Sequence, residues 1–273
     1  MRRSIFAASL CLLGLLVGSM AVARGFNVLI VLGDSNGQTE AAVIEPFGQI
    51  GGNTFSFAQL NIATGGTRPI AGGVIFADEV AAGNVKLSDY DMIWLTWNGP
   101  GHDGDYFMAG VEEDLLKFVE SGGIMFMSAF DDNFRDANGN QIGGWMPIDQ
   151  HPAAISNTGD SNLTITPAGE ATGIFAGVDT NALVLDDNFA DTDPAYTVLA
   201  TRDDNNQVAA FQLDYGLGAY LGVCVDARST FPAAEPMVGN LLGYMATLRA
   251  EASTSVEPAS KLPVTWGNVK IEY

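Results

Sequence analysis

The feature that most constrains the fold is a set of short, continuously apolar runs that end abruptly in small or polar residues. The clearest runs are residues 28–32, 91–97, 124–127 and 219–225. Strands buried on both faces have this pattern, and they occur in parallel sheets. An amphipathic helix expected over residues 107–120 connects the second run to the third. Strand, helix and strand in this order form a right-handed βαβ unit, so the sequence predicts an α/β three-layer sandwich with a mostly parallel central sheet.

Weaker signals for further elements surround this unit. Strands are expected at residues 54–62, 162–166, 196–201 and 207–213, helices at 38–47, within 167–177 and at 236–250, and either a helix or a strand at 74–82. The turn at residues 203–206 predicts a hairpin between two of the strands. Residues 251–260 indicate a flexible linker, and residues 262–273 a tail suited to an edge strand.

The N-terminal 23 residues have the pattern of a secretory signal peptide. Two arginines precede an apolar run over residues 5–17, and residues 21–23 form an Ala-x-Ala cleavage site. The run is shorter than the roughly 20 residues that a membrane-spanning helix needs. We therefore expect a secreted protein, extracellular or periplasmic and not integral to a membrane, with one domain over residues 24–250 and a linker and tail over residues 251–273.

The net charge and the cysteine content limit which partners the protein can bind and whether it can form a disulfide. The net charge is −20, and loss of the two signal-peptide arginines lowers it to −22. Nucleic acid and anionic membrane surfaces repel such a chain. Only Cys224 remains after cleavage, so the mature protein has no intramolecular disulfide. Its place in an apolar strand predicts a buried, inert thiol.

Five segments of the chain share the sequence pattern of one known superfamily. They are DYDMIWLTWNG, FVESGGIMFMSA, PAGEATGIFAGV, VLATRDDNNQVAAFQLDYGLGAYLGVCVD and PMVGNLLGYMATL. Together they resemble the class I glutamine amidotransferase-like superfamily, nearest its trehalose-utilisation (ThuA-like) branch. The resemblance covers roughly residues 26–250. It implies an open α/β sheet whose functional site lies beyond the carboxyl ends of the strands.

The residues that catalytic members of this superfamily use are missing from this chain. In those members the third strand leads into a Gly-x-Cys-x-Gly elbow, and a later His-Glu pair completes a triad. Here the elbow reads Met127-Ser128-Ala129-Phe130, and no late His-x-Glu exists. A thiolate needs a base to activate it, and both are absent, so glutamine hydrolysis is not expected.

Two serines offer an alternative, hydrolytic chemistry. Ser128 would use His102, in the loop after the neighbouring strand, as its base. Ser35, in a Gly-Asp-Ser block after the first strand, resembles the opening block of the GDSL/SGNH esterases, with Asn98 as the oxyanion asparagine. Asn98 is followed by Gly99 rather than Asp, and the late Asp-x-x-His of that family is missing. A secreted serine hydrolase or esterase using Ser35 or Ser128 with His102 stays an open alternative.

A polar loop after the third strand offers oxygen ligands for calcium. Asp136, Asn138 and Asn140 stand at alternate positions, and Asp131 could supplement them. The loop lacks the glycine position and the acidic twelfth residue of an EF-hand, and a solvated loop of turns has the same composition. Two histidines and one cysteine make a poor set for a transition metal. Calcium is the only cofactor that the sequence suggests, in a calcium-dependent surface or adhesion module.

The missing triad makes a non-catalytic protein the favoured interpretation. Its ligand pocket is expected beyond the carboxyl ends of the strands, with the side chains of Asp34, Asn98, His102, Ser128 and Asp131. Aromatic residues cluster in the same segments, and such residues suit stacking on a sugar. The sequence therefore predicts a secreted non-catalytic domain that binds a small ligand, such as a carbohydrate, or a protein partner at the carboxyl edge of the sheet.

Overall fold

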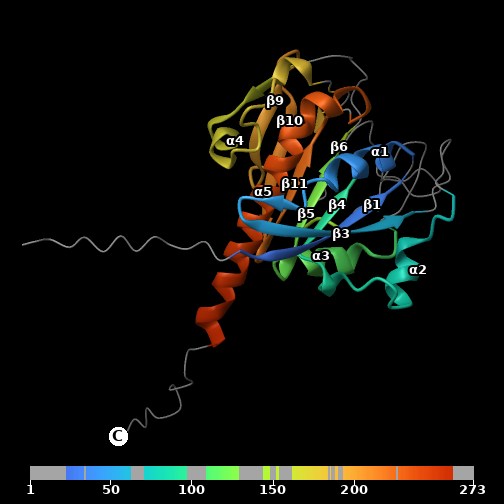
Figure 1. The fold of residues 1–273 in the computed structure, drawn as a ribbon. Helices are drawn as coiled ribbons and strands as arrows, with labels where there is room; N and C mark the ends of the chain where they lie inside the picture. Colours follow the sequence, from blue (N-terminus) through green and yellow to red (C-terminus); the bar gives the residue numbers. More distant parts are fainter. Residues whose placement is uncertain are drawn as a thin grey trace, which may run out of the picture.

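The chain forms an α/β protein built around one large sheet (Figure 1). The structure is a computed structural model. It describes residues 23–33, 35–62, 71–96, 109–128, 144–147, 152–153, 162–183, 185, 188–189, 193–225 and 227–260. The predicted signal peptide (apart from its last residue) and the tail over residues 262–273 lie outside the described residues, and both stay predictions.

Most predicted elements are present, with shifted bounds. The helices are α1 (Ser35–Ile44), α2 (Phe76–Ala81), α3 (Glu112–Glu120), α4 (Pro167–Thr172) and α5 (Ala227–Ser260), with the 3-10 helices η1 (Leu87–Asp89) and η3 (Thr180–Ala182). The strands are β1 (Gly25–Leu32), β2 (Gln49–Ile50), β3 (Asn53–Asn61), β4 (Met92–Leu95), β5 (Ile124–Ser128), β6 (Pro152–Ala153), β7 (Leu163–Ile165), β8 (Asn188–Phe189), β9 (Thr197–Arg202), β10 (Val208–Tyr215) and β11 (Gly218–Val223).

The sheet is mixed rather than mostly parallel. Its order is β2-β3-β1-β4-β5-β11-β10-β8-β6, and β9 pairs with β10 and with β7. Strands β3, β1, β4, β5 and β11 pair in parallel, which confirms the prediction for the central runs. The other pairs of described strands are antiparallel. A two-residue turn joins β10 to β11, and so short a connection permits only antiparallel pairing.

Two helices differ in extent from their predictions. The helix expected from residue 107 begins at Glu112, because Gly110 has a φ of +86°, which a right-handed helix cannot include. The structure continues α5 to Ser260, through the segment 251–260 for which a linker is expected, and the role of this segment as a linker stays a prediction. No glycine or proline interrupts residues 251–257, so the helix has no reason to stop there. Figure 1 shows this end of α5 extending beyond the sheet.

The sheet divides the core, because successive residues of a strand point to opposite faces. On one face, the rings of Trp94 (β4) and Phe126 (β5) pack with centroids 4.2 Å apart. Helices α1 and α5 contact each other, and α5 contacts β5 and β11. Tyr220 precedes Leu221, the register partner of Phe126, and so points to the opposite face. There its ring packs against Trp145 in a T-shaped arrangement, and its hydroxyl donates to the Trp145 carbonyl oxygen at 2.7 Å.

The antiparallel half of the sheet contains a buried cation. Arg202 of β9 is only 1% exposed. Its Nε and Nη2 donate to the two carboxylate oxygens of Asp204, each at 2.9 Å. Asn206 closes the same turn with a φ of +59°. The predicted hairpin at residues 203–206 is therefore confirmed. The hydrogen-bonded ion pair between Arg202 and Asp204 stabilises its turn, because a buried charge needs a partner.

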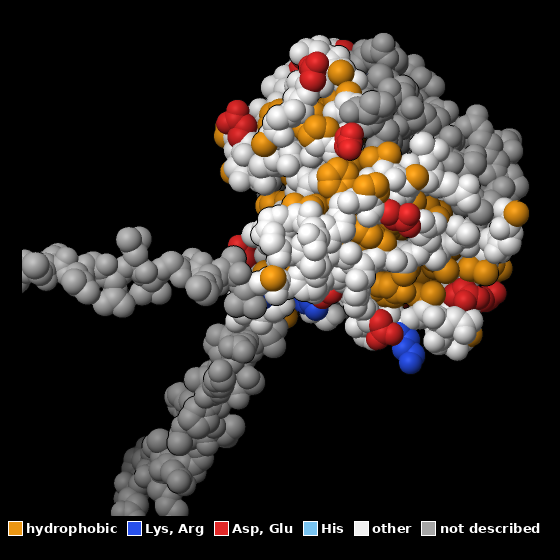
Figure 2. Space-filling model, viewed as in Figure 1, with side chains coloured by type: hydrophobic (Ala, Val, Ile, Leu, Met, Phe, Trp, Pro, Cys, Tyr) orange, Lys and Arg blue, Asp and Glu red, His pale blue; other side chains and the backbone are white. Residues whose placement is uncertain are grey.

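Acidic groups are prominent on the surface. Figure 2 shows acidic side chains spread over the visible face and few lysines and arginines among the coloured atoms, in keeping with the net charge of −20.

Within the described residues, no helix combines the length and apolar character needed to cross a bilayer.

Candidate functional site

The carboxyl ends of the parallel strands meet at one edge of the sheet, which we call the crest. Its described residues include Gly33 after β1, Thr96 after β4 and Ser128 at the end of β5. They share an edge because β1, β4 and β5 are neighbours that run in the same direction. Ligands of open α/β sheets bind at this edge, and the sequence places its pocket here.

Ser128 lies at the end of β5 as predicted, but its side chain is enclosed by packing. It is 7% exposed. The cavity that it lines, with Trp94, Phe126 and the α5 residues Met237 and Leu241, has only about 10 Å³ of free space. A single water molecule needs at least that much room. No substrate fits into the space between Ser128 and α5.

A buried carboxylate lines the same cavity, and the sequence reasoning missed it. Glu40 of α1 is 1% exposed, and its Oε1 accepts a hydrogen bond from Trp94 Nε1 at 2.7 Å. Among the described residues that line the cavity, Glu40 is the only acid or base. Helical spacing offers a signal for it: the buried positions of α1 are 37, 40, 41 and 44, so a glutamate occupies a place on the core-facing side.

The start of α1 packs tightly on the end of β4. A Cβ atom added to Gly37 would lie 2.4 Å from Thr96 Oγ1, closer than two such atoms can approach. Thr96 is fully buried, and its hydroxyl donates to the Val31 carbonyl oxygen at 3.0 Å. Glycine at position 37 therefore lets the helix approach the strand and brings Glu40 over Trp94.

The chemistry of the described crest is limited by these contacts. A serine nucleophile needs a base within hydrogen-bond reach and an open path for its substrate. The one described carboxylate that lines the cavity with Ser128 is hydrogen-bonded to an indole, and the cavity between Ser128 and α5 is nearly filled. The arrangement forms a rigid floor beneath the crest.

Most predicted site residues cannot be placed on this floor. Outside the described residues lie Asp34, Asn98, His102, Asp131, Asp136, Asn138 and Asn140. Ser35 begins α1 at the crest, and its side chain is outside the described part as well. Within the described ranges, no group of three or more His, Cys, Asp or Glu residues could hold a metal ion. Calcium binding in the loop after β5 stays a prediction.

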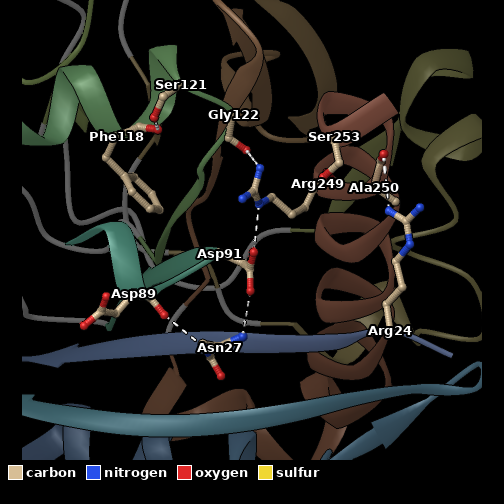
Figure 3. Close-up of polar contacts among 10 residues, drawn as sticks. All are labelled: Arg24, Asn27, Asp89, Asp91, Phe118, Ser121, Gly122, Arg249, Ala250 and Ser253. Carbon is tan, nitrogen blue, oxygen red and sulfur yellow. Dashed lines mark hydrogen bonds and ion pairs between the residues drawn. The ribbon is translucent and has the colours of Figure 1, made fainter. Parts of the chain in front are cut away.

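A polar cluster at the opposite, amino edge of the sheet was not predicted (Figure 3). Arg249 of α5 donates from Nε to Asp91 Oδ1 at 2.9 Å and from Nη1 to the Gly122 carbonyl oxygen at 3.4 Å. Asp91 Oδ2 accepts from the backbone N–H of Asn27 at 3.0 Å. This amino-edge clamp ties α5 to Asn27 of β1 and to the residues just before β4 and β5. Arg249 and Asp91 are 158 residues apart in the sequence, so no local sequence pattern could reveal the clamp.

Comparison with known proteins shows a shared fold. No protein-family model and no curated protein sequence matches the chain. A β-galactosidase from Rahnella sp. R3 is similar over 80% of this chain, with a TM-score of 0.51 and 13% identity. This chain spans only 31% of that enzyme's length, so it has the fold of one part of a larger protein.

Two further solved structures are similar over comparable lengths. A ThuA-like protein from Parabacteroides merdae matches over 82% of this chain and 90% of its own, with a TM-score of 0.47 and 13% identity. An exo-β-1,4-mannosidase from Opitutaceae bacterium strain TAV5 matches over 83% of this chain and 35% of its own, with a TM-score of 0.41 and 11% identity.

Proposed function

We propose that this protein is a secreted, non-catalytic domain of the glutamine amidotransferase-like superfamily, nearest its ThuA-like branch, and that it binds a carbohydrate at the crest. The packing around Ser128 carries the proposal. The cavity that this residue lines with α5 has about 10 Å³ of free space, and Glu40, which lines the same cavity, is hydrogen-bonded to Trp94. A hydrolase built on Ser128 needs both an open hydroxyl and an available base.

The composition of the loops beyond the crest favours a carbohydrate as the ligand. Asp34, Asn98 and Asp131 supply acceptors and donors for hydroxyl groups, and Trp97 and Phe130 supply aromatic faces. The Rahnella protein with the shared fold is a β-galactosidase, so galactosides are the first sugars to test. A protein partner at the same edge is the other outcome of that test.

We also propose a three-layer arrangement of this domain, with α1 and α5 on one face of the sheet and α3 on the other. Contacts of α5 with β5 and β11, beside the rings of Trp94 and Phe126, support the first layer. Contacts of α3 with the same two strands support the second. Solvent exclusion by both layers accounts for the burial of every residue of β5 and β11.

A glycan array probed with the mature chain tests the binding function. The best sugar is then titrated by calorimetry against the protein, Asn98→Ala and the control Asn84→Ala, which changes an exposed asparagine between α2 and η1. We expect Asn98→Ala to weaken binding by about tenfold, since a polar contact to the sugar is lost, and Asn84→Ala to bind normally. Retention of no sugar, or equal affinities in all three proteins, would overturn the carbohydrate proposal.

A fluorophosphonate probe tests the absence of catalysis. Such a probe labels a serine only where a base activates the hydroxyl. We expect no labelling of the mature chain and no hydrolysis of a panel of short esters. Labelling that disappears in Ser35→Ala or Ser128→Ala would instead identify a serine hydrolase and reject the non-catalytic proposal.

A further inference from the structure

A hollow of about 420 Å³ lies at the amino edge of the sheet, between the β10–β11 turn and α5. We call it the hairpin groove. Its walls combine apolar and polar side chains: Ile124, Leu217, Leu248 and Ala252, together with Gln212, Asp214, Tyr244 and Glu251. This groove is separate from the crest, where the carboxyl ends of the parallel strands meet.

One wall of the hairpin groove is a single face of α5. Tyr244, Leu248, Glu251 and Ala252 follow one another at spacings of four, three and one residues, which places them together on a helix surface. Arg249 holds the same stretch of α5 against the sheet through the amino-edge clamp. The wall is therefore fixed in position before any ligand arrives, and a preorganised site loses less entropy on binding.

A directed chain of hydrogen bonds crosses the groove. The Tyr244 hydroxyl donates to Gln212 Oε1 at 2.7 Å, and Gln212 Nε2 donates to Asp214 Oδ1 at 2.7 Å. A carboxylate has about four acceptor sites, and this chain fills one of those on Asp214. The phenol oxygen of Tyr244 also keeps its lone pairs as acceptors. The exposed polar groups of this chain thus favour a ligand that donates hydrogen bonds.

The electrostatics of the groove favour a cation. Burial raises the pKa of Tyr244, and the negative charges of Asp214 and Glu251 raise that pKa further. Both carboxylates therefore act on the same phenol, which stays neutral in ordinary buffers. Among the described residues that line the groove, none is basic. The guanidinium of Arg249 lies near Leu217 and Ala252 but is engaged by Asp91 and the Gly122 carbonyl oxygen, so the carboxylates lining the groove favour a cation over an anion.

The apolar part of the groove defines the rest of the ligand. Leu217 at the tip of the hairpin is 40% exposed, one of two large hydrophobic side chains described as exposed. Leu248 and Ala252 face the same hollow from α5. A chain of methylene groups laid between these side chains gains burial, as the stem of an amphipathic side chain does.

We infer that the hairpin groove binds a primary ammonium group on an aliphatic stem, as in a free alkylamine or a lysine side chain. The three N–H donors of the ammonium meet Asp214, Glu251 and the Tyr244 oxygen, and the stem lies along Leu217 and Leu248. This binding does not depend on what the crest binds.

The test compares n-pentylamine with 1-pentanol, which has the same stem and no charge. Each is titrated into the mature chain while methyl resonances of Leu217 and Leu248 are followed by NMR. We expect pentylamine to bind with a dissociation constant of about 1 mM and pentanol to bind at least about tenfold more weakly. Equal binding of both compounds, or shifts confined to the crest methyl of Met237, would reject the inference.

Peptides identify the source of the ammonium group. Gly-Lys-Gly with an acetylated N-terminus and an amidated C-terminus, and the Nε-acetylated form of this capped peptide, are titrated in the same way. Binding of the unmodified peptide alone supports a lysine side chain of a partner as the ligand, and binding of pentylamine without the peptide supports a free amine. Binding of the acetylated peptide as tightly as the unmodified one would contradict the role of charge.

Matched variants locate the site. Asp214→Asn and Glu251→Gln each remove one charge while keeping the size of an exposed side chain, and each should weaken pentylamine binding by about tenfold. Glu235→Gln changes an exposed glutamate elsewhere on α5 and should bind like the unmodified protein. Unchanged affinity in both groove variants, with folding verified by circular dichroism, would overturn the proposed site.

Discussion

Replacing Trp94 with phenylalanine tests the floor of the crest directly. The substitution keeps an aromatic ring beside Phe126 and removes the N–H that donates to Glu40 at 2.7 Å. Trp94 and Glu40 are each 1% exposed, so water cannot replace the lost donor without entering the core. Trp94→Phe therefore leaves a buried carboxylate with one hydrogen bond fewer.

Two contributions set the size of the effect. Removal of the donor from a buried acceptor costs about 1–3 kcal/mol of stability. The smaller ring leaves roughly 40 Å³ unfilled, which costs about 1 kcal/mol at ~24 cal/mol per Å³. We expect Trp94→Phe to lower the free energy of unfolding by about 2–4 kcal/mol, a large share of the ~5–15 kcal/mol typical of folded domains.

Urea unfolding measures this loss, with Glu40→Gln as the matched control. The glutamine oxygen still accepts from Trp94, so Glu40→Gln should cost about 1 kcal/mol or less. The effects of the two single variants should not add in the double variant, because both substitutions alter the same hydrogen bond. A loss below about 1 kcal/mol for Trp94→Phe, or additive effects in the double variant, would refute this account of the floor.

Four further outcomes are expected. Gly218→Ala should cost about 3 kcal/mol or more in urea unfolding, because its Cβ would lie 2.1 Å from a backbone oxygen, whereas Gly25→Ala, with 3.5 Å to its nearest neighbour, should cost little. Arg249→Ala should lose about 1–2 kcal/mol, since its ion pair is about one quarter exposed and therefore partly screened. Burial raises the pKa of Tyr220 and of Tyr244, so the unfolded state releases these protons first and stability should fall as the pH rises above about 10. Tyr220→Phe should make that fall shallower in a titration of Tm against pH. Finally, Tm should be the same with and without EDTA, and a lower value in EDTA would favour the calcium-dependent alternative.

The central strands could be located from the sequence, because burial on both faces leaves uninterrupted apolar runs. β5 (Ile124–Ser128) and β11 (Gly218–Val223) lie within two residues of their predicted bounds. Their pairing with each other could not be predicted, since about ninety residues separate them and no local pattern records such a contact. The hairpin of β9 and β10 was predictable because its turn residues are contiguous.

The bounds of α5 show where local signals mislead. Proline favours the first turn of a helix, so Pro236 indicated the start of this one. The helix begins at Ala227 and passes through Pro236, whose side chain is exposed. Packing of Leu241, Leu242 and Met245 in the core stabilises α5 despite the hydrogen bond that a proline cannot make.

Only part of the candidate site could be predicted from the sequence, because the rest depends on contacts between distant segments. Ser128 follows its strand directly, so its place at the crest could be derived from the chain. Its enclosure could not, because Met237 and Leu241, more than a hundred residues later, fill the space beside it. Helical spacing indicates that Glu40 faces the core, but it cannot reveal its partner Trp94, which belongs to another element.

The central place of β11 has a consequence for how the molecule assembles. This strand pairs in parallel with β5 on one side and antiparallel with β10 on the other, so it joins the two halves of the sheet. It is synthesised about ninety residues after β5, although its Ala219 pairs with Ile124 of that strand. Until β11 emerges from the ribosome, β5 remains an open apolar edge, which is a template for aggregation. The order of synthesis therefore leaves β5 without its second neighbour for about ninety residues, and the parallel half of the sheet is completed only when β11 is available.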